Sequence, residues 1–468
     1  MPVARTLPLT LDCRDGAALL EALPPGPGRF LLESGPAGPD DIRRYTFLGA
    51  EPFLSFVTRG REAYVYEEGR TRVVEGDPLL HLQALLNKCR VEAPPGLVGF
   101  PGGAVGYLAY DLGRQIERLP ELARDDLNLP DVHLGFYDVV VALDHQRGEA
   151  FLVVAPLAGR EAEAMAKARR WAAAMKRAEP LPDLGPVAPG RRAVSSYRRA
   201  EYLAAVERAL DYIGAGDIFQ VNLAQRFSCP WEEGGWQLYR RLRAGTPAPF
   251  AAFLDMGSWQ VVSGSPERFI TVRDGIIETR PIKGTRPRGK TPEEDQANAA
   301  ELLASEKDAA ELVMIVDLQR NDLGRVCEYG TVTVPDLRRL EATPNVWHTV
   351  ATVEGRLRPG VTAREIIRAT FPGGSITGAP KVRAMEIIEE LEPVRRGVYT
   401  GAIGYIGFDG RMDWNIAIRT AVVKEGMAYF YAGGGLVADS APELEYQETL
   451  AKGSGLARAL GVSLDDLP

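Results

Sequence analysis

The pattern of hydrophobic and polar positions predicts many short strands and fewer helices. Residues 269–279 alternate around an Asp-Gly pair, which is typical of a β-hairpin, and 218–227 alternate in the same way. Apolar residues spaced three and four apart predict helices at 78–88, 161–177 and 202–214. Because strands and helices cluster instead of alternating regularly, we expect an α+β fold with mainly antiparallel sheets.

Glycine and proline mark the boundaries of the chain's larger parts. A stretch rich in both, at 181–194, predicts a linker between an N-terminal α+β region, 1–180, and a C-terminal region, 195–468. We expect the two regions to pack as one unit. The glycine-dense segment 99–108 lacks a Gly-x-Gly-x-x-Gly motif that opens a helix, so it predicts a backbone crossing and no dinucleotide site.

Composition excludes several classes of function. The chain has 468 residues, of which 45% are hydrophobic and 25% are charged, as in ordinary globular proteins. It has no apolar run of the roughly 20 residues that cross a bilayer and no signal-peptide pattern, so we expect a cytoplasmic protein without a membrane partner. Its four cysteines lie far apart, which favours neither disulfides nor a zinc site. The net charge of −8 and the scattered basic residues argue against nucleic acid as a partner.

Lys283 is the residue around which the candidate chemistry gathers. Pro281 lacks a ladder donor and Gly284 relaxes the backbone, so Lys283 is expected at the mouth of a strand. A lysine there is ordinarily a solvated cation. The downstream motifs change this picture, because they suggest a small anionic substrate bound with a hard metal. Lys283 would then be the nucleophile.

Two carboxylate pairs have helical spacing. Asp308 and Glu311 share a face of the segment 291–325, which begins with Pro292 as a helix does. Glu445 and Glu448 form the second pair, and Lys452 follows one turn later. Each pair alone is typical of a solvated helix face. Together they suit Mg²⁺, which takes one or two direct carboxylates and keeps several waters.

Glycine-rich stretches and single polar residues complete the set. Residues 371–381 resemble a phosphate loop but lack its lysine spacing, so we expect their amides to hold a carboxylate instead of a nucleotide. Gly433, Gly434 and Gly435 form a second bare surface, either a tight turn or a place where a ligand approaches the backbone. His348, Glu267 and Arg419 lie in or between predicted strands, and each alone equally fits a structural role.

In this order, the motifs resemble those of the chorismate-using enzymes, a family that includes the anthranilate, aminodeoxychorismate, isochorismate and salicylate synthases. The resemblance is dense over 195–468 and weaker before it, where 31–34 still match. It implies large antiparallel β-sheets packed as a sandwich with helices on the outside. The matching segments are 265–268, 280–285, 315–318 with 320–322, 371–392 and 432–440.

Within this family, the chain is most similar to the aminodeoxychorismate synthases. Anthranilate enzymes usually carry Ala where this chain has Lys283, and Thr-Leu-Ser where it has 375–377; 220–225 also resemble the aminodeoxychorismate enzymes. The resemblance implies replacement of the C4 hydroxyl of chorismate by an amino group, for folate and para-aminobenzoate synthesis. A glutamine amidotransferase partner would supply the ammonia.

The resemblance also implies a role for each site residue. Lys283 would attack C2 of chorismate and Glu267 would protonate the leaving hydroxyl. Lys283 must be neutral to attack, against an ordinary pKa of about 10.4, so burial or a cation such as Arg280 should lower its pKa. His348 matches an active-site position. Mg²⁺ would bind Glu311 and Glu448, with Asp308 and Glu445 held through water. Substrate contacts are expected from Gly284, Thr285, Ser375, Tyr399, Arg419, Gly433, Gly434, Gly435 and Lys452, and a possible tryptophan site from Ser34.

Two alternatives remain open from the sequence. The first is anthranilate synthase, which would release pyruvate and form anthranilate. The second is a non-catalytic regulatory chain that binds only chorismate or tryptophan. Product analysis with chorismate, magnesium and an ammonium salt distinguishes all three.

Overall fold

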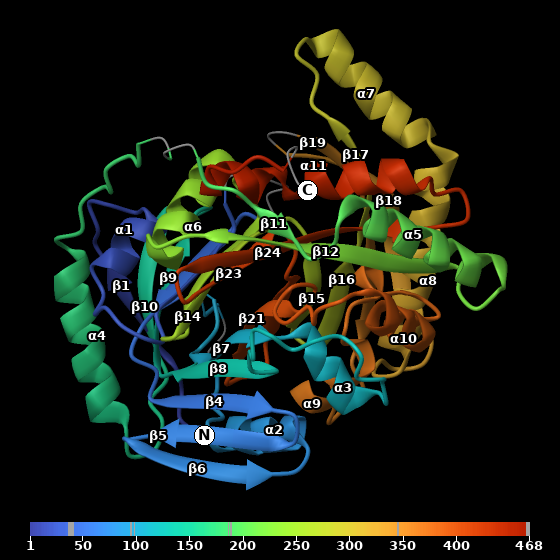
Figure 1. Cartoon of the computed structure of the whole chain (residues 1–468). Coiled ribbons are helices and arrows are strands. Elements are labelled where there is room, and N and C mark those ends of the chain that lie inside the picture. The colour runs from blue at the N-terminus through green and yellow to red at the C-terminus, as the bar shows by residue number, and fades with distance from the viewer. Residues whose placement is uncertain are drawn as a thin grey trace.

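Two large antiparallel sheets, with helices on their outer sides, make up the computed structural model of the chain (Figure 1). This arrangement confirms the α+β sandwich. The structure describes residues 1–35, 42–93, 96–97, 99–185, 187, 190–343 and 346–464. Within these ranges, every helix is too short or too polar to span a bilayer.

Within the described residues, the first sheet contains 12 strands from both parts of the chain. In spatial order they are β1 (Arg5–Leu9), β10 (Glu149–Val154), β9 (Val139–Asp144), β3 (Tyr45–Gly49), β2 (Phe30–Glu33), β13 (Phe250–Asp255), β14 (Trp259–Ser265), β23 (Thr420–Lys424), β24 (Met427–Leu436), β12 (Gln220–Pro230) and β11 (Val194–Ser195), with β20 (Gly378–Ala379) also paired to β12.

The second sheet also contains 12 strands. Their order is β17 (Ile282–Pro287), β19 (Val346–Arg356), β16 (Ile276–Arg280), β15 (Arg268–Arg273), β22 (Met412–Ile416), β21 (Ala402–Gly407), β7 (Gly103–Leu108), β8 (Val132–Tyr137), β4 (Leu54–Arg59), β5 (Glu62–Glu67) and β6 (Arg70–Glu75), with β18 (Thr333–Ala342) on β19.

The helices connect and cover these strands. They are α1 (Gly16–Glu21), α2 (Pro78–Lys88), α3 (Gly113–Ile116), α4 (Glu161–Met175), α5 (Arg199–Gly214), α6 (Gly234–Gly245), α7 (Pro292–Ala304), α8 (Glu306–Gly324), α9 (Ala363–Thr370), α10 (Lys381–Leu391) and α11 (Pro442–Leu460), with the short 3-10 helices η1 (Tyr110–Leu112) and η2 (Gly374–Ile376).

Each sheet consists of one block of strands from 1–180 and one block from the rest of the chain, and the two blocks meet at a single ladder. In the first sheet, Leu31 of β2 pairs with Phe253 of β13. In the second, Gly106 of β7 pairs with Gly404 of β21. The linker at 181–194 therefore separates the two regions in sequence, while their backbones are joined by ladder hydrogen bonds.

The glycine-dense segment differs from its prediction. Residues 103–108 form β7, an inner strand of the second sheet, so the predicted backbone crossing is wrong there. A Cβ at Gly106 would lie 2.0 Å from the carbonyl oxygen of His133, and one at Gly103 would lie 2.3 Å from that of Ile406. The glycines thus permit close approach of neighbouring strands.

The acidic helical segment is divided in two. α7 ends at Ala304, and the Ser305 side chain accepts a hydrogen bond from the Asp308 N–H, 3.2 Å away, to begin α8. In Figure 1, α7 projects from the body of the molecule, whereas α8 lies along it. The break sets the direction of the helix that carries Asp308 and Glu311.

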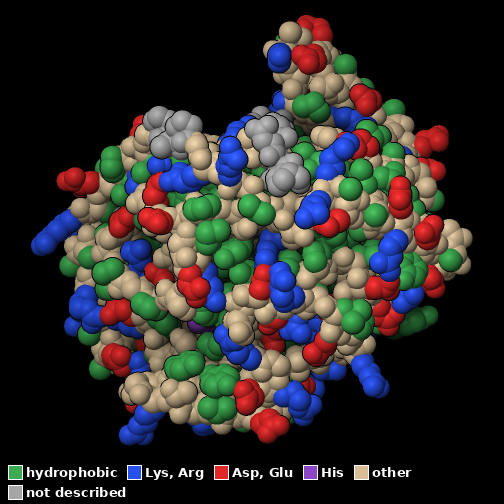
Figure 2. All heavy atoms as spheres, viewed as in Figure 1, with side chains coloured by type: hydrophobic (Ala, Val, Ile, Leu, Met, Phe, Trp, Pro, Cys, Tyr) green, Lys and Arg blue, Asp and Glu red, His purple; other side chains and the backbone are tan. Residues whose placement is uncertain are grey.

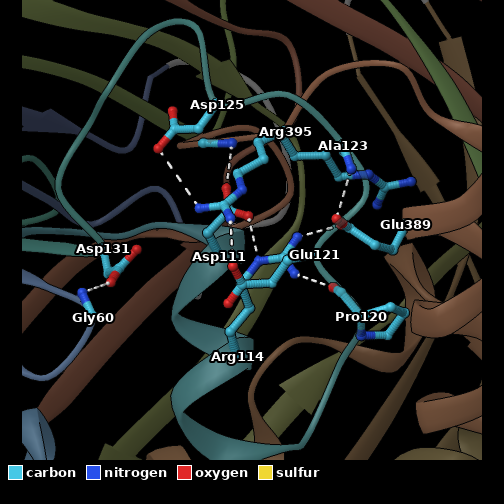
Figure 3. Close-up of polar contacts among 12 residues, drawn as sticks. Gly60, Asp111, Arg114, Pro120, Glu121, Ala123, Asp125, Asp131, Glu389 and Arg395 are labelled. Carbon is cyan, nitrogen blue, oxygen red and sulfur yellow. Dashed lines mark hydrogen bonds and ion pairs between the residues drawn. The ribbon is translucent and has the colours of Figure 1, made fainter.

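A charged network attaches the segment after η1 to α10 and to the chain beyond it (Figure 3). Arg114 forms ion pairs with Asp111 and with Glu389 of α10. Glu389 also accepts the Ala123 N–H at 2.8 Å, and Asp111 accepts the Gly397 N–H at 2.9 Å. These contacts hold the backbone just before Tyr399.

Candidate active site

Lys283 lies in an irregular part of the β17–β19 ladder. It pairs with Thr349, Thr285 pairs with His348, and the register shifts between the two pairs. Gly284, in the shift, has φ +74°, and a Cβ there would lie 3.0 Å from Cγ of Asp308. A glycine at this position lets the bulged strand bend and re-aims its side chains.

The Lys283 amine lies beside Glu311 of α8 and beside the glycine residues of β24. Nζ lies 4.0 Å from Oε2 of Glu311, and the lysine side chain is 13% exposed. A Cβ at Gly435 would lie 3.3 Å from the same Nζ. Burial lowers the pKa of Lys283 while Glu311 opposes the shift, and Lys452 lowers it further. Arg280, the cation expected in that role, pairs instead with Glu341.

The three glycines form part of a strand instead of a turn. Gly433, Gly434 and Gly435 belong to β24 and pair with residues 222–224 of β12. A Cβ at Gly434 would lie 2.9 Å from Oε2 of Glu445 and 3.3 Å from Oε1 of Glu448. The bare backbone therefore separates the lysine from the α11 carboxylates and leaves space beside both.

Each of the four predicted acids has a close polar neighbour. Asp308 accepts a hydrogen bond from Arg286 at 3.3 Å, and Glu445 accepts one from Ser440 at 2.6 Å. Glu448 pairs with Lys452 at 2.5 Å. The Lys452 amine also donates to the Gly433 carbonyl at 3.1 Å, so it bridges α11 and the glycine strand.

Glu311 and Glu448 approach each other from α8 and α11. Burial raises the pKa of Glu311, and the charge of Glu448 adds to the rise. Burial also acts to raise the pKa of Glu448, but Lys452, Lys283 and Lys307 together bring it below its ordinary value. Among the residues described, no three His, Cys, Asp or Glu side chains gather as metal ligands. Two carboxylates from different helices, both within reach of the Lys283 charge, nevertheless fit Mg²⁺, which completes its shell with water.

Glu267 lies between β14 and β15 and is 5% exposed. The Ser375 hydroxyl, from the glycine-rich loop, donates to its Oε1 at 2.7 Å. Burial raises the pKa of Glu267 to about 7, although Ser375 and Lys283 oppose the shift. A carboxyl group with this pKa can hold and release a proton near neutral pH.

His348 and Arg419 face the same region. The His348 Nδ1 lies 2.9 Å from the Thr285 hydroxyl, while its buried Nε2 has no hydrogen-bond partner in the described parts of the chain. Burial and the charge of Arg419 lower the pKa of His348 to about 4, so the imidazole is neutral. Arg419 has φ +50°, a strained conformation that is often found at functional sites. Burial lowers the pKa of Arg419, and the negative charge of Glu267 offsets part of this decrease.

Tyr399 is positioned by the backbone beside Arg419. Its ring stacks on Tyr431 at a centroid distance of 5.0 Å. The next residue, Thr400, donates its N–H to the Ala417 carbonyl at 2.8 Å, two residues before Arg419. The structure thus brings these two predicted substrate contacts to one end of β22.

Two residues of β12 enter the site without having been predicted to do so. Gln220 is fully buried, and neither atom of its amide group has a partner in the described ranges. Its Nε2 lies 2.8 Å from the position of a Cβ on Gly435. Asn222 donates to the Ser375 carbonyl at 3.1 Å. The sequence signal for both residues was the alternation of polar and apolar positions along the predicted strand, which places Gln220 and Asn222 on its polar face.

Ser34 lies away from these residues, just after β2. Its buried Oγ lacks a hydrogen-bond partner within the described residues. The adjacent Glu33 pairs with Arg243 and lines a cavity of about 650 Å³, together with His145 and Arg14. The tryptophan site therefore remains a prediction, with a polar cavity next to it.

Comparison with known proteins places the chain among enzymes that act on chorismate. Residues 30–458 match the model of the chorismate binding enzymes, and the chain belongs to this family. It is 44% identical to the aminodeoxychorismate synthase component 1 of Salmonella typhimurium, over 91% of each protein. It is 45% identical to the anthranilate synthase component 1 of Thermus thermophilus, over 95% of this chain and 94% of the relative.

The fold agrees with this assignment. The crystal structure of anthranilate synthase component I from Streptococcus pneumoniae superposes with a TM-score of 0.78 at 34% identity, covering 88% of this chain and 92% of the other. Relatives at similar identity thus carry two different reaction names.

Proposed function

We propose that the protein is an aminodeoxychorismate synthase component I. It converts chorismate and ammonia to 4-amino-4-deoxychorismate, for folate and para-aminobenzoate biosynthesis. The observation that carries this choice is the amine of Lys283. It is largely withdrawn from solvent, its pKa is lowered, and it lies between Glu311 and Gly435 at the centre of the site.

The amine has a chemical use at this position. Neutral Lys283 attacks C2 of chorismate, the two conjugated ring double bonds shift from C1=C2 and C5=C6 to C1=C6 and C4=C5, and the C4 hydroxyl leaves. Hydroxide is a poor leaving group, so protonated Glu267 donates its proton and water departs. Ammonia then adds at C4, both double bonds shift back, and the Lys283 amine is released from C2. The net reaction exchanges hydroxyl for amine and forms one water.

The remaining residues bind and orient the substrate. Arg419, Tyr399, Ser375 and the backbone at 433–435 hold its carboxylates, and Gly284 with Thr285 shapes the mouth of the lysine strand. Neutral His348 offers a hydrogen bond through its free Nε2. Lys452 adds positive charge beside Gly433.

Glu311 and Glu448 are the proposed magnesium ligands, with Asp308 and Glu445 acting through water. A bound Mg²⁺ would neutralise the substrate's ring carboxylate and fix its orientation. The charge of Glu448 contributes to the raised pKa of Glu311, which supports this assignment because a divalent cation beside the two carboxylates would offset that effect.

We propose two binding partners besides chorismate. A glutamine amidotransferase subunit supplies ammonia, and tryptophan occupies the pocket near Ser34. The buried, unpaired Ser34 hydroxyl supports the second of these.

Anthranilate synthase is the second candidate. The 45% identity to a relative of that name favours it. The two reactions differ in product, because only the anthranilate reaction eliminates pyruvate.

Incubation of the purified chain with chorismate, Mg²⁺ and an ammonium salt decides between them. We expect 4-amino-4-deoxychorismate, detected by chromatography with mass spectrometry, and no pyruvate in a lactate dehydrogenase assay. Pyruvate together with anthranilate fluorescence would overturn the proposal in favour of the second candidate.

A further inference from the structure

A second cavity, of about 470 Å³, lies on the sheet that carries Lys283, but near the sheet's opposite edge. Its walls come from β4, β5 and β8, whereas Lys283 lies on β17. In Figure 2, hydrophobic side chains gather over β4 and β5 on this part of the surface. The cavity is therefore separate from the site described above, and the volume is in the range of small-molecule sites.

The cavity walls are mainly aromatic and aliphatic. Val57 pairs with both Tyr64 and His133, so their side chains share one face of the sheet. Met256 and Trp259, from the β13–β14 hairpin, form the opposite wall. The Trp259 ring meets the His133 ring edge-on, with centroids 5.4 Å apart. Such walls favour a flat ring.

One polar atom of the cavity wall has no hydrogen-bond partner in the described chain. It is Nδ1 of His133, which is buried. Behind the wall, Tyr107 is fully buried and pairs with His133 across β7 and β8. The Tyr107 hydroxyl has the Trp259 side chain as its hydrogen-bond partner. Because buried polar atoms are normally paired, the His133 end of the cavity is suited to a polar substituent.

Arg59 gives the cavity a positive rim. Asn128 accepts hydrogen bonds from its NH1 and NH2, at 2.5 and 2.7 Å, and so holds the guanidinium in place. No acidic residue is among the described residues that line the cavity. His133 is neutral, because burial lowers its pKa to about 4. The charge of the lining therefore favours an anion.

We propose that this cavity binds a small planar aromatic carboxylate. The ring lies between Val57 and Trp259, the carboxylate meets Arg59, and a polar ring substituent reaches Nδ1 of His133. This site is independent of the proposed reaction at Lys283.

Two-dimensional NMR of the whole chain tests the site with 4-hydroxybenzoate as the probe. The six tryptophans give six indole signals, and the one lost in Trp259→Phe belongs to Trp259. We expect the probe to shift this signal in a saturable way. Arg59→Gln should weaken binding about tenfold, as expected for loss of a charged hydrogen bond. The neutral amide, 4-hydroxybenzamide, should bind weakly to either form.

Arg72→Gln is the matched control, since Arg72 is exposed on β6 and pairs with Val65, on the other face of the hairpin. It should leave binding unchanged. Val57→Phe, which fills the cavity, should abolish the shift and provides a second test if Arg59→Gln lowers the melting temperature. The proposal is overturned if the probe leaves the Trp259 signal unmoved, or if Arg59→Gln and Arg72→Gln have the same effect.

Discussion

Lys283 is ordinarily the kind of side chain that stays charged in water, and its surroundings change that property. Burial favours the neutral amine, because the charged form loses hydration. Burial raises the pKa of Glu267, because the neutral form that burial favours is the protonated carboxylic acid. One environment thus prepares both a nucleophile and an acid.

Replacing Lys283 with Ala should remove the covalent intermediate. We expect intact-mass spectra of the wild-type protein, quenched with chorismate and Mg²⁺ but without ammonia, to show an adduct of chorismate minus water. Lys283→Ala should show none, whereas Lys176→Ala, at an exposed position directly after α4, should retain it. An adduct that survives in Lys283→Ala would place the nucleophile elsewhere.

The pH dependence of the reaction should report Glu267. Its raised pKa, about 7, means that the protonated form required of an acid is lost as pH rises through 7. We expect kcat to fall above this pH in the wild type. Glu267→Gln should lower kcat by about 10²–10⁴-fold and remove this limb of the profile. If the limb persists in Glu267→Gln, another group supplies the proton.

At the scale of elements, the site depends on the three consecutive glycines of β24, Gly433, Gly434 and Gly435. β24 approaches β17, α11 and β12 because residues 433–435 are glycines. A side chain on Gly434 or Gly435 would occupy the space beside the α11 acids or Lys283, and one on Gly433 would lie 2.5 Å from the carbonyl oxygen of Leu223 in β12.

Gly435→Ala tests this dependence. Its Cβ would lie 2.8 Å from the Gln220 amide nitrogen and 3.3 Å from the Lys283 amine, so we expect at least about a tenfold loss of kcat/KM, with 1–3 kcal/mol of destabilisation from overpacking. Gly324→Ala, where the added methyl meets nothing within 4 Å, should keep full activity and gain up to about 1 kcal/mol. Equal activity of both variants would refute the role of the bare strand.

α8 and α11 should together set the magnesium requirement. Glu311→Gln and Glu448→Gln should each raise the Mg²⁺ concentration for half-maximal activity by at least about tenfold, measured by titration after EDTA treatment. Glu306→Gln, at the exposed start of α8, is the control and should leave the titration unchanged. Activity of the wild type that survives EDTA would contradict the metal assignment.

At the scale of the whole molecule, both sheets combine strands from 1–180 and 195–468. The β2–β13 and β7–β21 ladders cross between these regions. Neither region can complete a sheet without the other, so the two should share one unfolding transition.

Calorimetry checks this expectation. The intact chain should unfold in a single peak, and cleavage within 181–194 should leave the two pieces associated under native conditions. Residues 1–180 expressed alone should show exchange-broadened NMR spectra. Two separated calorimetric peaks for the intact chain would contradict the shared core.

Local patterns predicted most elements well, because their signals lie within a few residues. The hairpin at 269–279 is present as β15 and β16, and the helix at 78–88 is α2. The prediction was wrong for 103–108, where glycine density suggested a crossing. The reason for these glycines is contact with His133 and Ile406, which are distant in sequence.

By itself, the sequence determined the class of fold, the reactive residue types and the family, since these depend on periodicity and ordered motifs. The tertiary structure alone decided which residues meet. The packing of the first sheet and of α8 and α11 against β17 placed Glu311 and Gly435 beside Lys283, brought Gln220 into the site, and set Lys452 instead of Arg280 as the cation that lowers the lysine pKa. Burial and charge act through space, so the pKa values that make Lys283 and Glu267 reactive exist only once the chain has folded.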